Sequence, residues 1–488
     1  MASSTATTAS PATSAAPGKL PLSSLAAMVI GSMVGAGIFN LPGRFATATG
    51  PFGALIAWAI AGTGMYMLAR VFQALAEKRP DIDNGVFAYA KAGFGDYVGF
   101  LSAFGYWLGS VLGNTFYWVL IGATLGRFFP EFFGDGTSAF SIIVSLIGIW
   151  AFHFLILRGV QQATFINTVV TIAKIVPLIL AVLLFVFFFN YSQFSENFFG
   201  GVGMPEKSLV MQVRDTMLIT VFVFIGIEGA SVYSRFAQKR SDVGAATILG
   251  FVAVTGLMVA ITLLPYATAP RASIAGVANP SLAGALELVV GHWGAVMISI
   301  GVLVSVLGAF LAWTLICAEV LFAAGKSKDM PQLFASQNAN EVPTNALWLS
   351  NILVSLFVIS TYWSRDAFNF MLDMCSVTTL FPYLLVAGYG VILARSGVGY
   401  EKAPDERSRD RIIAWLAVVY TVFMIIAAGT KYVILTCVLF APGTILYFWA
   451  RREQNARLFT GMELAVFAVL IVGAAIGVYG LATGLITP

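Results

Sequence analysis

The sequence predicts an all-α protein that crosses a membrane about thirteen times, and three observations lead to this fold class. First, 59% of the 488 residues are hydrophobic and only 10% are charged, whereas soluble domains carry roughly 25% charged residues. Second, the mean hydropathy is +0.87, and the apolar residues form runs of about 20, the length that a helix needs to cross a bilayer. Third, the positive charges are divided unequally between the two sets of loops that these runs define. The lipid bilayer is therefore the expected solvent of this chain.

Each predicted span is a mostly apolar run bounded by charged or turn-forming residues. Helices are expected throughout, because backbone groups in hydrocarbon must be paired within the segment or within a closed barrel. The shortest interruption is Gly429, Thr430 and Lys431, between the eleventh and twelfth spans. The expected spans are residues 20–45, 51–76, 97–125, 139–157, 163–189, 214–236, 244–268, 291–323, 346–363, 367–394, 412–429, 431–450 and 461–484.

The lysines and arginines predict the orientation of the chain. With a cytoplasmic N-terminus, eighteen of the 27 Lys and Arg residues fall inside and seven outside, while Arg70 and Lys174 lie within spans. This asymmetry agrees with the positive-inside rule. An odd number of spans then places the C-terminus on the outer side of the membrane. Residues 1–18, rich in Ala, Ser and Thr, are expected to form a disordered cytoplasmic tail.

Composition disfavours several other classes of function. The basic residues are scattered through short loops at a net charge of +4, which predicts no nucleic-acid partner. The three cysteines lie in apolar runs, and His153 and His292 have no ligand partners at suitable spacing, so we expect no metal, haem or other cofactor. A membrane enzyme would need convergent His, Cys or acidic clusters, and a sensor usually appends a regulatory domain. The sequence indicates neither.

Glycines interrupt the first predicted span. The run GSMVGAGIF, from Gly31 to Phe39, places three glycines within seven residues. Glycine weakens a helix and frees backbone N–H groups that can face an anion. A seam of small residues for close helix packing would give the same pattern, so this run alone does not separate the two interpretations.

The sixth predicted span contains a second interruption. Glu228 lies between Gly226 and Gly229 in the apolar run FVFIGIEGAS. An ionisable group at that depth is costly and usually faces the bundle interior or a water-filled cavity. Two interrupted spans in corresponding positions indicate a transporter built from inverted repeats, with its binding site near the bilayer midplane.

Four motifs follow one another in the order of a known family over about residues 20–395. They are GAGIFNLP at 35–42, PDIDNGVFAY at 80–89, FIGIEGA at 224–230 and KSKDMP at 326–331. These motifs resemble signatures of the amino acid–polyamine–organocation superfamily. The chain departs from the family pattern at Asn84 and at residues 237–240, which affects the subfamily rather than the fold. A thirteenth span resembles the arginine/ornithine antiporter and lysine permease branch of the basic amino acid/polyamine antiporters.

The resemblance implies a leucine-transporter-like fold of two inverted five-helix repeats with discontinuous helices 1 and 6. Residues 19–189 would form the first repeat, 190–395 the second, and 396–488 the accessory helices 11–13. It implies a secondary transporter rather than an enzyme, with a basic amino acid (arginine, ornithine or lysine) as its partner, and leaves a homodimer open. Arginine/ornithine antiport by alternating access is the expected function. The alternative is proton-coupled uptake of lysine or another amino acid.

The resemblance also implies which residues bind the substrate. Backbone amides of the first break would bind its carboxylate, and carbonyls of the second break its α-ammonium, as the helix dipoles favour. Aromatic and polar side chains of the third, sixth and eighth spans would complete the pocket, because an aromatic ring stacks well on a guanidinium. Taken singly, each aromatic could equally belong to the core. The expected residues are Met33, Gly35, Ala36, Gly37, Tyr106, Ser110, Asn114, Tyr117, Phe222, Ile225, Gly226 and Trp313.

Ionisable residues within spans are further candidates. Glu228 and Asp373 could each serve a cationic substrate group, with Cys375 and Ser376 beside Asp373 as additional binding residues. Alternatively, Asp373 lies in water near the outer end of its helix. Lys174 is the only lysine at mid-span depth, about ten residues from the nearest surface, which disfavours snorkelling. Relatives place such a lysine where sodium-coupled cousins bind sodium, so Lys174, together with Glu228, is the expected coupling residue.

Overall fold

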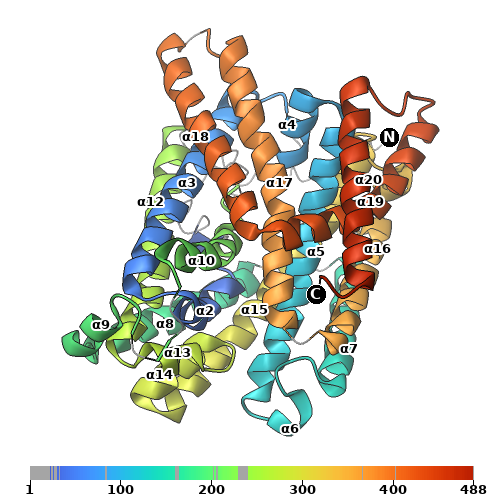
Figure 1. The fold of residues 1–488 in the computed structure, drawn as a ribbon. Helices are drawn as coiled ribbons and strands as arrows, with labels where there is room; N and C mark the ends of the chain where they lie inside the picture. The colour runs from blue at the N-terminus through green and yellow to red at the C-terminus, as the bar shows by residue number, and fades with distance from the viewer. Residues whose placement is uncertain are drawn as a thin grey trace, which may run out of the picture.

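The computed structural model describes residues 22, 26, 30–31, 33–82, 85–159, 164–201, 203–204, 207–228, 240–364, 366–401 and 403–486. Over these residues every regular element is helical. Long helices run between the two ends of the molecule, and shorter helices gather at each end (Figure 1). The expected tail 1–18, Asn84, Gly229 and most of residues 237–240 lie outside the described residues.

Ten helices of the described chain are long and apolar enough to cross a membrane, or eleven if a bent pair is counted as one span. The polytopic all-α fold is thereby confirmed, and the number thirteen stays a prediction. The first and sixth expected spans do not count among the ten, since most of residues 20–29 and all of residues 229–239 lie outside the described residues that were searched. The long helices are α3 (Pro51–Lys78), α5 (Asp96–Gly126), α7 (Ala139–Leu157), α8 (Thr164–Phe187), α10 (Leu209–Phe224), α12 (Arg240–Leu263), α15 (His292–Lys326), α16 (Thr344–Ser360), α17 (Ala367–Ser396), α18 (Pro404–Ala428), α19 (Thr430–Glu453) and α20 (Gly461–Ala482).

Short helices cover both ends of the bundle. Four of them lie at one end, while α4 and the α17–α18 and α19–α20 connections lie at the other (Figure 1). The four are α6 (Pro130–Phe133), α9 (Tyr191–Asn197), α13 (Arg271–Ala275) and α14 (Ser281–Val290). The remaining short elements are η1 (Ala36–Asn40), α2 (Leu41–Ala48), α4 (Gly85–Phe94), η3 (Leu264–Ala267), η4 (Gln332–Ala335) and η5 (Thr361–Trp363).

Capping groups explain where several helices begin and end. The Ser138 hydroxyl accepts a hydrogen bond from the N–H of Ser141 at the start of α7, which satisfies a donor that the first turn leaves unpaired. Gly397 follows α17 in the left-handed conformation, with φ of 80°, as is common at helix ends. The helix α18 begins at Pro404 rather than at residue 412, because proline suits the first turn and its charged residues extend the helix beyond the apolar run.

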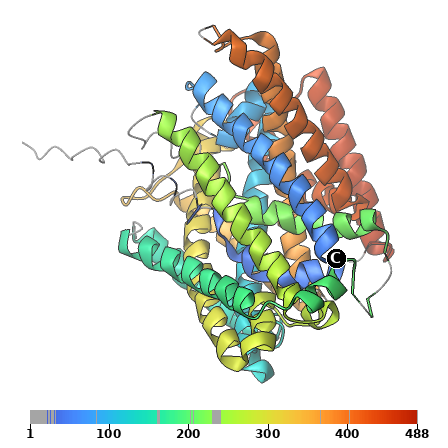
Figure 2. The same ribbon diagram turned by 90° about the vertical axis from the view of Figure 1, so that its left-hand side faces the viewer.

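The helix α5 is buried along nearly its whole length and packs against α17, α15 and α4. Glycines allow this close approach: a Cβ on Gly109 would lie 2.6 Å from the Thr379 hydroxyl, and one on Gly105 would lie 2.7 Å from the Phe440 ring. On the outside of the bundle, α3 lies between α12 and α18 (Figure 2). The central α5 can therefore serve as one wall of an internal site.

Both glycine-containing runs are interrupted at the same place in the fold. Gly35 is extended between Met33 and η1, with φ of −103° and ψ of −169°. The helix α10 ends at Phe224, Ile225 is extended, and Gly226 has a φ of 106°, which favours glycine. A Cβ on Gly37 would lie 2.6 Å from the Phe222 ring, so the missing side chain lets the two runs approach each other.

Candidate functional site

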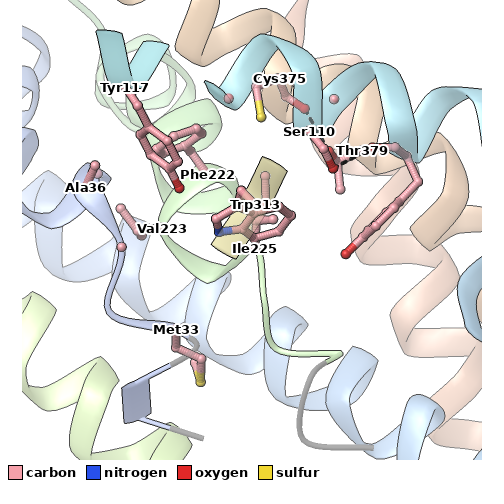
Figure 3. Close-up of a pocket in the computed structure, with 15 residues that line it drawn as sticks. Met33, Ala36, Ser110, Tyr117, Phe222, Val223, Ile225, Trp313, Cys375 and Thr379 are labelled. Atoms are coloured by element: carbon pink, nitrogen blue, oxygen red, sulfur yellow. Dashed lines mark hydrogen bonds between the residues drawn. The ribbon is translucent and has the colours of Figure 1, made fainter. Parts of the chain in front are cut away.

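An internal cavity lies where the two interruptions meet α5, α15 and α17 (Figure 3). Backbone-rich segments form one part of its wall, and aromatic, hydroxyl and thiol side chains form the rest. No acidic or basic side chain lines this cavity in the described part of the chain. The lining residues are Met33, Gly35, Ala36, Gly37, Tyr106, Gly109, Ser110, Gly113, Tyr117, Phe222, Val223, Ile225, Trp313, Cys375 and Thr379.

Eleven of the sixteen expected substrate-binding residues line this cavity, and five do not. The sequence reasoning missed Gly109, Gly113, Val223 and Thr379. Helical periodicity was the available signal, because Gly109 and Gly113 lie one and two turns after Tyr106, and Thr379 lies one turn after Cys375. The five expected residues outside the lining are Asn114, Gly226, Glu228, Asp373 and Ser376.

The Glu228 carboxylate joins three segments beside the cavity. Its oxygens accept hydrogen bonds from the Tyr106 hydroxyl at 2.5 Å, the Tyr383 hydroxyl at 2.6 Å and the N–H of Gly226 at 3.1 Å. Tyr106 belongs to α5 and Tyr383 to α17. Glu228 is only 8% exposed, so in this structure it connects the second break to the walls of the cavity.

The Asp373 carboxylate binds other protein groups and does not line the cavity. It forms an ion pair with Arg44 of α2 at 2.6 Å, and the Tyr432 hydroxyl of α19 donates to it at 3.0 Å. The carboxylate residue is 3% exposed, so it is not in water at the end of its helix. Its negative charge is therefore already matched by Arg44 of α2.

The other residues outside the lining have local partners. The Asn114 amide donates to the Cys317 sulfur at 3.5 Å. The Ser376 hydroxyl is hydrogen-bonded to the carbonyl oxygens of Leu218 and Leu372, at 2.9 and 3.0 Å. Ser376 thus connects α17 to α10. Both side chains support the walls and do not face the cavity.

Lys174 lies on α8, half-buried and outside the cavity lining. The neighbouring Ala173 carbonyl oxygen would be 3.3 Å from a Cβ on Gly301, so α8 packs closely against α15 at this level. Within the described ranges no hydrogen-bond or ion-pair partner of Lys174 occurs. A lysine at this depth without a carboxylate partner remains a candidate for coupling.

Two hydroxyl groups in the cavity wall already donate hydrogen bonds to backbone carbonyl oxygens. The Ser110 hydroxyl donates to the Tyr106 carbonyl at 2.9 Å, and the Thr379 hydroxyl donates to the Cys375 carbonyl at 2.8 Å. Each hydroxyl has one proton and two acceptor lone pairs. While these two bonds are kept, the oxygens offer lone pairs to a ligand. The cavity wall at α5 and α17 therefore suits a hydrogen-bond donor.

Comparisons with known proteins agree with this architecture. Residues 20–434 match the family model described as amino acid permease. The chain is 47% identical to the arginine/ornithine antiporter of Pseudomonas aeruginosa, over 96% of this chain and 98% of that protein. It is 40% identical to the L-lysine transport protein of Corynebacterium glutamicum, over 94% of each. It is 37% identical to the arginine/agmatine antiporter of Chlamydia abortus, over 89% and 90%. The chain therefore belongs to the amino acid permease family of the amino acid–polyamine–organocation superfamily, whose members are membrane transporters rather than enzymes.

Proposed function

We propose that this chain exchanges basic amino acids across a bacterial inner membrane, arginine against ornithine, by alternating access. The observation that carries the proposal is the pair of hydroxyls, Ser110 and Thr379, whose protons are committed to carbonyl oxygens. Guanidinium and ammonium groups carry donors and no acceptors. While both bonds are kept, a cationic side chain satisfies both hydroxyl oxygens, whereas a carboxylate would have to turn a hydroxyl away from its carbonyl.

The rest of the cavity supplies matching groups for an amino acid. The interruption near Gly35 would present N–H groups to the substrate carboxylate, and the extended Ile225 would present its carbonyl to the α-ammonium. A Cβ on Gly35 would meet no atom within 4 Å, so the chain faces open space at this position. Trp313 would stack on the guanidinium or on the aliphatic stem of the side chain.

Cation recognition by neutral groups has a physical advantage in an exchanger. A carboxylate in the cavity would require compensation whenever the substrate leaves, because an unpaired buried charge is costly. Here the two nearby carboxylates keep protein partners: Asp373 pairs with Arg44, and Glu228 accepts from two tyrosines. Among the residues that the structure describes, the cavity wall therefore carries no unpaired acidic charge.

A second function, proton-coupled uptake of lysine, is supported by Lys174. The amine lies within α8 without a partner in the part of the chain that the structure describes, and a relative is an L-lysine transport protein. Loss of a proton from a buried ammonium removes a desolvated charge. Such a residue could bind one proton per transport cycle.

The proposal includes the expected topology. The N-terminus is placed in the cytoplasm and the C-terminus in the periplasm, on the distribution of positive charges. Residues 19–189 and 190–395 are proposed as the inverted repeats, and 396–488 as accessory helices. The site residues are those that line the cavity, with Glu228 and Lys174 in coupling.

Counterflow in proteoliposomes tests the function. Vesicles loaded with unlabelled ornithine, or left empty, receive labelled arginine outside. Exchange predicts uptake only with internal ornithine. Uptake that ignores the internal load and follows an imposed proton gradient would favour the permease, and Lys174→Gln should then abolish it.

A matched pair of variants tests the hydroxyl observation. Thr379→Val removes an acceptor from the cavity, while Thr421→Val removes a hydroxyl with the same bond to the preceding turn in α18. We expect Thr379→Val to raise the arginine KM about tenfold and Thr421→Val to leave it unchanged, since one hydrogen bond to a charged group contributes roughly 1.5–3 kcal/mol. Equal KM values in the two variants would contradict the proposed recognition.

A further inference from the structure

Besides Arg409, three arginines gather where α17 ends and α18 begins, at the end of the molecule that carries α4 (Figure 1). Arg395 lies in the last turn of α17, and Arg407 and Arg411 lie in the first turns of α18. The Arg407 guanidinium donates to the carbonyl oxygens of Ala394 and Arg395, at 2.8 and 2.7 Å. These bonds hold the start of α18 against the end of α17 and keep the three charges at one corner.

Two of the carboxylates at this corner are paired with other cations, and two, Glu401 and Asp405, have no cationic partner among the residues that the structure describes. Glu406 pairs with Lys78 at 2.7 Å, and Asp410 pairs with Arg409 at 3.1 Å. Arg395 and Arg411 are both exposed, and their guanidinium groups have no hydrogen-bond or ion-pair partner among the residues that the structure describes. Their positive charge is therefore available to a ligand.

The same corner adjoins an uncovered apolar surface. The Trp415 ring is 44% exposed, and its centroid lies 5.4 Å from the Arg395 guanidinium carbon. One face of α18 then continues as an exposed apolar stripe at helical spacing. The stripe consists of Ile412, Leu416, Val419, Phe423 and Ile426. Arg411 immediately precedes the stripe, so charge, aromatic ring and apolar face follow one another along the helix, as at a membrane–water boundary.

We propose that Arg395, Arg411 and Trp415 form a binding site for the headgroup of an anionic phospholipid, whose acyl chains lie along the α18 stripe. Guanidinium groups bind phosphate oxygens through paired N–H donors, and basic residues beside a span attract anionic lipids. Phosphatidylcholine carries a phosphate but also a choline cation, so its headgroup has no net charge to match two arginines. Phosphatidylglycerol has the required charge and is the probe for the test.

Native mass spectrometry of the full chain in detergent tests this site. The protein is titrated with phosphatidylglycerol or with phosphatidylcholine of the same acyl chains. Arg395→Gln/Arg411→Gln should weaken the first phosphatidylglycerol bound roughly thirtyfold, about fivefold or more for each charge, and leave phosphatidylcholine unchanged. Arg158→Gln/Lys326→Gln removes two exposed basic residues elsewhere and should leave phosphatidylglycerol affinity intact.

Two further arms keep the result interpretable. Arg395→Lys/Arg411→Lys retains the charge and should retain most of the affinity, and melting temperatures in detergent verify that each variant is folded. Equal losses in the corner pair and the Arg158/Lys326 pair would show general charge attraction and overturn the site. Displacement of phosphatidylglycerol by millimolar inorganic phosphate would overturn the lipid as occupant, because the acyl chains would then contribute nothing.

Discussion

The ion pair between Arg44 and Asp373 links α2, the helix that follows the first break, to the first turns of α17. Asp373→Asn would leave the Arg44 charge without its counter-ion, and removal of one partner of a buried pair costs about 3–5 kcal/mol. The Arg44 side chain is 21% exposed, so water screens part of this cost and the lower value, about 3 kcal/mol, is expected. Replacement of both partners should cost much less than the two single changes together, because neither charge is then left alone.

A double-mutant cycle measures this coupling. Asp373→Asn, Arg44→Gln and the double variant are unfolded reversibly in mixed micelles with increasing sodium dodecyl sulfate, and tryptophan fluorescence reports the free energy of unfolding. We expect a coupling energy of about 2–3 kcal/mol. The exposed pair Lys207–Asp215, at 2.6 Å with side chains 46% and 38% exposed, is the control. Asp215→Asn should cost about 0–1 kcal/mol.

Two outcomes would refute this reasoning. Additive single effects below about 1 kcal/mol would mean that the pair adds no stability. Alternatively, Asp373→Asn with unchanged stability but lost arginine binding, and with neutral amino acid binding retained, would assign the carboxylate to the substrate, as the sequence alone suggested.

Three further predictions follow from the geometry. Tyr383→Phe removes a hydroxyl donor 2.6 Å from Glu228 and should cost about 1.5–3 kcal/mol in the same assay. Tyr420→Phe removes a buried hydroxyl that has no partner among the described residues and should cost less. Equal costs in the two variants would contradict the role of Glu228 in joining the helices. Gly37→Ala places a Cβ 2.6 Å from the Phe222 ring and should lower stability by about 1–3 kcal/mol. The Cβ of Gly35→Ala would meet no atom within 4 Å. Gly35→Ala should therefore lower arginine affinity while the melting temperature is unchanged. Burial opposes the charge of Lys91, but Asp329 at 2.5 Å and Asp96 at 3.5 Å raise the pKa of Lys91 overall. A pKa that is raised in the folded state contributes stability that is complete below the unfolded pKa of about 10.4. This stability disappears as the pH rises through the folded pKa. The melting-temperature difference between wild type and Lys91→Met should thus be constant from about pH 6 to 9 and shrink above about pH 10.5, and a difference that shrinks below pH 9 would count against this ion pair.

The sequence by itself predicted the bilayer as solvent, the all-α polytopic fold and the region of the cavity that we propose as the binding site. Apolar runs of span length indicate helices that cross a bilayer, and the runs at 139–157 and 367–394 agree closely with α7 and α17. The interruptions around Gly35 and Gly226 were also readable, because glycine and an intramembrane carboxylate oppose a continuous helix by local chemistry alone. Motif matches and helical periodicity likewise pointed to most of the residues that line the cavity.

Only the tertiary structure decided what each buried charge faces. Asp373 and Arg44 are far apart in sequence, and nothing near either residue indicates that they neutralise each other at 2.6 Å. The partners of Glu228, Tyr106 and Tyr383, come from two other helices. A side chain on a helix can face a cavity, a partner or lipid depending on which neighbour covers it, and that choice depends on long-range packing. Spacing along the chain therefore locates a buried charge in the membrane, while the packed helices determine whether it meets a substrate or another residue.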